Sequence, residues 1–287
     1  MLRFDLTAPN GDAIPCARFD APEALAAYLA GPVAAYGTTR WGDDDMGFYG
    51  ADRADTLHRA LLGDVERVAA SDALLNRMEN AVGFEARRWR TVDCVAGGSP
   101  NVTAFLAGSP MSMRRRVRTM DTAAPLTIAV EMTVSANAKP AEIARRGAAA
   151  LALARIAAAA RPVTLWAYYG AQNYGQNAAF AVRIETAPLD LARAAWLLCS
   201  PEACRRAALS ICCVVGGWPA EGGGAQWMQD HAATMAAILP TLTGAADFVS
   251  VAGLNTTEGR EAFASDTAAA AWVASMLATH GAVERAA

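Results

Sequence analysis

The sequence predicts an α/β protein with three layers: a mostly parallel sheet, helices on both of its faces, and a mainly helical N-terminal elaboration. From residue 125 onwards, short apolar runs alternate with helical stretches, which is the order that produces parallel strands joined by helices. The apolar runs lack a polar face, as expected for strands covered on both sides. The chain has 287 residues, 54% of them hydrophobic, so it can bury a large core without disulfides or metal.

We divide the chain into two parts by its periodicity. Residues 1–124 form the N-terminal elaboration, and residues 125–287 form the α/β domain. The first part has helical periodicity over residues 22–35 and 54–81. Ser99 and Pro100 are typical of the start of a short helix that ends at Gly108.

The second part contains five expected strands and four expected helices. Proline at position 240 is expected to end the third of these helices, and Asp266 is expected to cap the last. The strands are expected at residues 126–134, 163–169, 180–186, 209–215 and 248–252, and the helices at 141–160, 190–199, 226–239 and 266–279.

Composition restricts the classes of function. The formal net charge is −3, which argues against a protein whose whole surface binds nucleic acid or anionic lipid. The first residues lack the apolar core of a signal peptide, and the apolar stretch at 147–160 is too short to span a bilayer. None of the six cysteines forms a C-x-x-C pair. We therefore expect a cytoplasmic protein with reduced, buried thiols and no contact with membranes.

Three oxygen-bearing side chains follow one another at alternate positions at the end of the first strand of the second part: Glu131, Thr133 and Ser135. Oxygen ligands at this spacing can converge on a hard cation such as Mg²⁺. The pattern resembles the D-x-S-x-S motif of von Willebrand A domains, with glutamate in place of aspartate and threonine in place of the first serine. The resemblance extends over residues 125–287 and implies a degenerate A-type domain, with or without Mg²⁺.

A second resemblance concerns residues 97–110 and the following Met113-Arg114-Arg115-Arg116. This segment is similar to uncharacterised proteins of bacteriophage and mobile-element genomes. The resemblance implies a phage or plasmid origin, and hence the cytoplasm of a bacterial host, but no activity.

Arginine clusters are the sharpest local feature of this acidic chain. Arginine binds phosphate through two parallel hydrogen bonds, and an interleaved tryptophan can stack on a base. The alternatives are a solvated face, pairing with acids such as Asp43, Asp44 and Asp45, or an acidic protein partner. The candidate nucleic-acid-binding residues are Arg87, Arg88, Trp89, Arg90, Arg114, Arg115, Arg116 and Arg118.

No motif for nucleophilic, metal-assisted or acid–base catalysis is present, so no catalytic residue is predicted. The preferred hypothesis is a non-enzymatic binding or adaptor protein. Its target would be single-stranded nucleic acid, or a phage machine that handles nucleic acid in transcription or replication. One alternative is an Mg²⁺-dependent protein–protein interaction module of the von Willebrand A type. The other is an enzyme of unrecognised type, with a site assembled from distant residues. The oligomeric state is left open.

Overall fold

A six-stranded sheet forms the centre of the protein in the computed structural model, which describes residues 1–33, 46–82, 89–118, 125–159, 161–173, 175–218 and 231–280. The strand order is β1-β2-β8-β7-β6-β9. Three of the five pairings are parallel, namely β2–β8, β6–β7 and β6–β9. The predicted α/β class with a mostly parallel sheet is thus confirmed. The strands are β1 (Leu2–Thr7), β2 (Ala13–Phe19), β6 (Leu126–Glu131), β7 (Val163–Asn173), β8 (Gln176–Ile184) and β9 (Val249–Val251).

Side chains alternate between two buried layers along the central strands. In β6, Ile128 and Val130 face a large helical layer, whereas Ala129 belongs to a smaller core on the opposite face. Both sets are fully buried, which explains why the run from Ile128 to Val130 in β6 is apolar on both faces. By the same alternation, Glu131 lies on the face of the smaller core.

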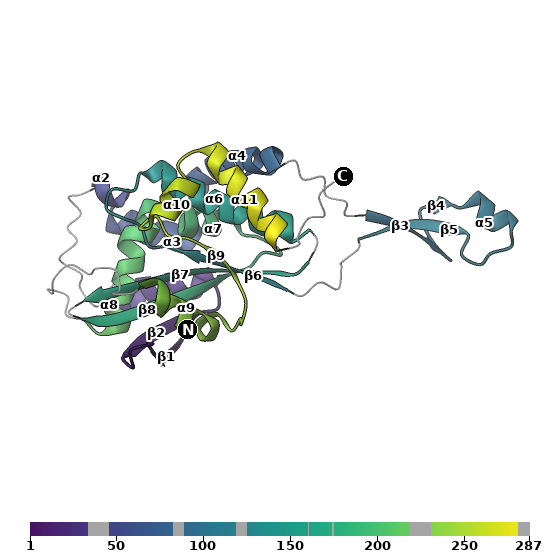
Figure 1. Cartoon of the computed structure of the whole chain (residues 1–287). Coiled ribbons are helices and arrows are strands. Elements are labelled where there is room, and N and C mark those ends of the chain that lie inside the picture. The colour runs from purple at the N-terminus through teal and green to yellow at the C-terminus, as the bar shows by residue number, and fades with distance from the viewer. Residues whose placement is uncertain are drawn as a thin grey trace.

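Helices cover the two faces unequally (Figure 1). The large layer packs α4, α6 and α11 against one another over one face, with α1, α7 and α8 beside them. The opposite face is covered by α9 (His231–Thr243), through Met235, Ile238 and Leu242. None of the described helices is both long and apolar enough to cross a bilayer. The remaining helices are α1 (Pro22–Tyr28), α2 (Met46–Tyr49), α3 (Arg53–Leu62), α4 (Val65–Val82), α6 (Pro140–Ala157), α7 (Leu191–Cys199), α8 (Ala208–Gly216), α10 (Thr257–Ala262) and α11 (Asp266–Thr279), with π-helical turns η1 (Leu29–Val33) and η2 (Ala203–Ala207).

A second, three-stranded sheet has the order β3-β5-β4 and is antiparallel throughout. We call it the arginine sheet, because its central strand carries Arg114, Arg115, Arg116 and Arg118. It consists of β3 (Trp89–Cys94), β4 (Ser99–Pro100) and β5 (Met113–Arg118), with the short helix α5 (Val102–Leu106) between β4 and β5. Figure 1 draws these elements apart from the layers of the six-stranded sheet.

The strand expected at residues 209–215 is wrong, because this segment is the helix α8. Its apolar run fits either a buried strand or two turns of a buried helix. The preceding η2 already has helical backbone, so the chain continues as a helix. It ends at Gly217, whose positive φ of 64° is typical of a helix C-cap.

Four helix boundaries also differ from the expectation. The single helix expected over residues 54–81 is broken between α3 and α4 by Gly63, whose φ of 84° favours glycine. Helix α9 continues past Pro240 to Thr243, since the proline removes one backbone hydrogen bond without ending the helix. Side chains of Asn101 and Ser265 cap α5 and α11, in place of the expected Ser99 and Asp266.

The expectation that residues 1–124 are a mainly helical elaboration is wrong for their two ends. The hairpin β1–β2 belongs to the central sheet, where β2 lies parallel to β8 and pairs Cys16 with Ala179. The end of this part carries the arginine sheet. The central sheet therefore includes strands from both sides of the division at residue 124.

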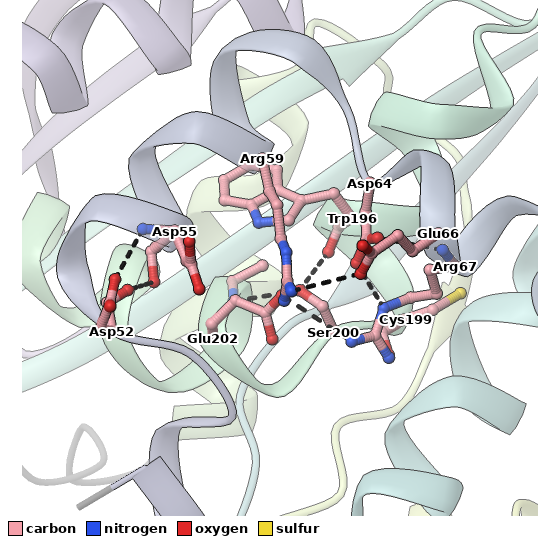
Figure 2. A network of polar contacts seen from close by, with 12 residues as sticks. Asp52, Asp55, Arg59, Asp64, Glu66, Arg67, Trp196, Cys199, Ser200 and Glu202 are labelled. Atoms are coloured by element: carbon pink, nitrogen blue, oxygen red, sulfur yellow. Dashed lines mark hydrogen bonds and ion pairs between the residues drawn. The ribbon is translucent and has the colours of Figure 1, made fainter.

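A buried ion-pair network joins the helices of the large layer (Figure 2). Glu202 has a fully buried side chain, and its Oε1 lies 3.2 Å from Nη1 of Arg59 and 3.8 Å from Nη2 of Arg67. Arg67 also contacts Asp64 at 2.8 Å, and Asp64 accepts a hydrogen bond from the Arg67 amide at the start of α4. These charges are compensated within the fold, so we assign the network to stability.

Burial makes the thiols unreactive. It raises the pKa of Cys16 and Cys199 to about 12 and that of Cys213 to about 11, and it also raises the pKa of Cys204 and Cys212. Because the thiolate is the reactive form, we expect iodoacetamide at pH 8 to leave these five cysteines unmodified in the native protein. Mass spectrometry after labelling, with a urea-unfolded sample as control, measures this. Rapid native labelling of any of the five would contradict the packing.

Candidate functional site

The carboxyl ends of β6 and β9 meet at one edge of the central sheet, beside the middle of the parallel strand β7, which continues to Asn173. In open α/β sheets the carboxyl ends of strands are where ligands bind. Six residues gather there, from the end of β6 and the residues after it, the middle of β7, the turn after β9 and the first residue of α9. We call them the strand-end cluster: Glu131, Thr133, Tyr168, His231, Gly253 and Asn255.

The Glu131 carboxylate is the centre of the cluster. Its Oε1 lies 2.8 Å from Nε2 of His231, and its Oε2 accepts hydrogen bonds from the Gly253 amide at 3.3 Å and the Tyr168 hydroxyl at 3.5 Å. Burial acts to raise the pKa of Glu131, but His231, the Gly253 amide and the Arg146 charge together lower it below its ordinary value. Burial and the nearby Glu131 charge raise the pKa of Tyr168. Glu131 is therefore ionised and Tyr168 protonated at neutral pH.

Among the described residues, three polar atoms of the cluster are buried without a hydrogen-bond partner: Oγ1 of Thr133, Nδ1 of His231 and Oδ1 of Asn255. A buried polar group left unsatisfied costs about 1–3 kcal/mol, and here three of them lie around one carboxylate. A Cβ at Gly253 would lie 2.4 Å from Oδ1 of Asn255 and 2.7 Å from Oε1 of Glu131. Only glycine allows these oxygens to approach so closely.

The contact between Glu131 and His231 determines which ring nitrogen of His231 is left for other partners. A carboxylate that holds Nε2 of an imidazole fixes the orientation of the ring, and Nδ1 is then the nitrogen that can exchange a proton or bind a ligand. The sequence showed His231 as one of three scattered histidines. Only the fold brings it to Glu131.

The predicted metal ligands are only partly brought together. Glu131 and Thr133 share the strand-end cluster, whereas the Ser135 hydroxyl accepts a hydrogen bond from the Asn137 amide. The Glu131 carboxylate is already held by His231, the Gly253 amide and the Tyr168 hydroxyl, so a cation would compete with these contacts. Within the described ranges, no three His, Cys, Asp or Glu side chains are grouped as a metal site requires. The metal site thus stays a prediction from the sequence.

The predicted arginine clusters lie on paired strands. Arg87 and Arg88 fall outside the described residues, and Trp89 and Arg90 begin β3. The register pairs Trp89 with Arg118 and Arg90 with Val117. Two segments that are far apart in the sequence therefore form one antiparallel surface.

Two arginines of this surface, Arg114 and Arg115, are accessible. Arg115 is exposed, and Arg114 contacts Asp93 at 3.3 Å with about half of each side chain exposed. Exposed pairs of this kind contribute about 0–1 kcal/mol, so a phosphate can compete for Arg114. The half-buried arginines Arg59 and Arg67, in contrast, are held by the buried Glu202.

The lowered pKa of Glu131 predicts a pH dependence of stability. Its ionised form stabilises the fold at pH values above the ordinary 4.5, and this contribution is lost as the pH falls through the lower value of the folded state. We expect the Glu131→Gln variant to be less stable than the wild type at pH 7, with the difference shrinking below about pH 4.5. Urea denaturation at pH 7 and pH 4 measures the difference.

Glu185→Gln is the matched control, because Glu185 is exposed beside Arg183. Its stability should follow the wild type at both pH values, within about 0.5 kcal/mol. Equal pH dependence of Glu131→Gln and the wild type would refute the electrostatic role of Glu131.

The fold defines the class of protein: an α/β protein with a mixed, mostly parallel sheet, which carries the strand-end cluster, and an additional antiparallel sheet, the arginine sheet. A family model described as "Domain of unknown function (DUF7192)" matches residues 20–239, and the chain belongs to this family. No match was found among curated proteins or among solved structures.

Proposed function

We propose that this protein is a non-enzymatic binding protein that takes up single-stranded nucleic acid on the arginine sheet. The observation that carries the proposal is the register of β3 and β5, which sets Trp89 and Arg90 on the strand beside Arg114, Arg115, Arg116 and Arg118. Guanidinium groups bind phosphate through paired, charge-assisted hydrogen bonds. A row of them along a strand follows a nucleic-acid backbone, and the contacts do not depend on base sequence.

The distribution of charge supports this assignment. The protein is acidic overall, with a net charge of −3, but β5 has four arginines among its six residues. A basic strand in an acidic protein directs polyanions to one place on the surface.

The proposal has a second part: the protein is an adaptor, and its central sheet is a von Willebrand A-type domain. The order β6, α6, β7 and the following β8 agrees with the resemblance that Glu131, Thr133 and Ser135 suggest. In this proposal the domain holds a protein partner from the transcription or replication machinery, while the arginine sheet holds the nucleic acid.

The test is binding of labelled single-stranded and duplex DNA and RNA across a salt series. We expect the wild type to bind with a steep salt dependence, and a variant with Arg114, Arg115 and Arg116 changed to Ala to lose most affinity. Each phosphate contact adds about 0.7 to the slope for single strands. Arg114 and Arg116 share one face of β5 by the alternation along a strand, so losing their two contacts lowers the slope by about 1.4.

The control is a variant with Arg77, Arg155 and Arg183 changed to Ala. These arginines are partly exposed and belong to elements of the six-stranded sheet and its helices. Both variants lose three positive charges, so their net charges are equal. It should bind as the wild type does. Unchanged binding by the Arg114, Arg115 and Arg116 variant, or no binding by the wild type at low salt, would overturn the proposal.

A further inference from the structure

Exposed apolar side chains are concentrated beside the arginine sheet. Residues 95–111 supply half of the large hydrophobic residues that are exposed in the described part of the chain. An apolar concentration of this kind marks an interaction site rather than an ordinary surface. The exposed fractions are 70% for Val95, 61% for Val102, 69% for Phe105, 80% for Leu106 and 46% for Met111.

The connection places the start of α5 close to Arg114. Strand β4 pairs Ser99 with Arg114, and α5 begins three residues later at Val102. Asn101 caps α5 through Oδ1, which accepts a hydrogen bond from the Ala104 amide at 3.2 Å.

One carboxylate connects the cap of α5 to the strands. Oδ1 of Asp93 in β3 accepts hydrogen bonds from Nδ2 of Asn101 at 3.1 Å and from Nε of Arg114 at 3.3 Å. The first turn of α5 and the arginine strand therefore share one anchor.

The chemistry of this surface restricts its occupant. The arginines of β5 need a polyanion, and Val102, Phe105 and Leu106 need an apolar surface directly beside it. A nucleic-acid single strand offers both, because its phosphates are charged and every unpaired base has an apolar face. A duplex hides these faces in its stack, so the apolar side chains of α5 would gain little from it.

We propose that Val102, Phe105 and Leu106 form a base-contacting surface beside the arginine sheet, so that the protein selects unpaired nucleic acid over duplex. Phe105 supplies the stacking face, and Val102 and Leu106 shield the bases from water. This inference rests on the proposed function, since the arginines must first hold the phosphates.

The experiment compares a 20-nucleotide oligothymidylate with an oligomer of the same length that consists of abasic sites. Both carry the same backbone charge, and only the first has bases. We expect the wild type to bind the oligothymidylate at least about tenfold more tightly, from the typical contribution of one stacked base. The Phe105→Ala variant should lose this preference. The Phe105→Trp variant should retain the preference of the wild type, because tryptophan also offers a stacking face.

The salt dependence separates this role from charge. Phe105→Ala should leave the slope against salt concentration unchanged, because it removes no phosphate contact. Leu62→Ala is the control, since Leu62 has a similar exposed fraction of 61% but lies on α3. It should keep the full preference for bases.

Three outcomes would refute the base-contacting surface alone, and a fourth would refute the proposed function. Equal binding of the two oligomers by the wild type, or an unchanged preference in Phe105→Ala, would refute the base-contacting surface and leave the arginine proposal standing. Binding of duplex as tightly as oligothymidylate would also refute it. No binding of either oligomer at low salt would refute the proposed function itself.

Discussion

Replacing Glu202 with glutamine is expected to lower the free energy of unfolding by about 3–5 kcal/mol, the usual cost of removing one partner of a buried ion pair. The Glu202 side chain is fully buried, and Arg59 contacts it at 3.2 Å. A neutral amide removes the buried anion that contacts Arg59 most closely and leaves the exposed Glu66 at 3.8 Å and the charges of Asp64 and Asp55. Urea denaturation followed by circular dichroism measures the loss.

Glu66→Gln is the matched control, because Glu66 pairs with the same arginine but its side chain is 90% exposed. Its expected effect is below about 1 kcal/mol. If both variants lost the same small amount, the network in Figure 2 would not be the electrostatic connection between α3, α4 and η2 that its geometry indicates.

Replacing Gly147 with alanine is expected to destabilise the protein by about 1–3 kcal/mol, although alanine favours helices over glycine. A Cβ at this position of α6 would lie 2.5 Å from both Sγ of Cys199 and the carbonyl oxygen of Leu198. The second contact is with backbone, so α6 and α7 would have to move apart. Thermal and urea denaturation report the change.

Gly31→Ala is the control for this second variant. Gly31 lies in η1, and a Cβ there meets no atom within 4 Å. We expect its stability to be unchanged or raised by up to about 1 kcal/mol. A stabilising effect of Gly147→Ala would show that the contact between α6 and α7 is looser than described.

Strands and helices could be predicted from the sequence where an apolar run fits only one of the two structures. The predicted strands at 126–134 and 163–169 correspond to β6 and β7, since flanking helices and prolines limit the choice. The segment 209–215 could not be resolved, because burial on all sides removes the periodicity that separates a helix from a strand. The arginine strand β5 was missed as a strand for another reason: charged residues on both faces leave no apolar alternation.

The candidate site was only half visible in the sequence. Spacing along one strand drew attention to Glu131 and Thr133, but His231 lies a hundred positions away and reaches them only through packing of α9. For Arg146 the sequence suggests the wrong environment. Its charge suggests a solvated position in an alanine-rich helix, yet its side chain is fully buried beside Leu198 and Cys204. Burial of a charge follows from how two helices cross, which one-dimensional periodicity does not contain.

The pairing of β2 with β8 has a consequence for synthesis of the protein. The ribosome releases β2 long before β8, and Cys16 meets its partner Ala179 only after more than half of the chain has been made. Until then the β1–β2 hairpin has an unpaired edge that other chains can extend. Contacts between such distant segments form slowly, so protection of this hairpin in the nascent chain is expected to control the yield of folded protein.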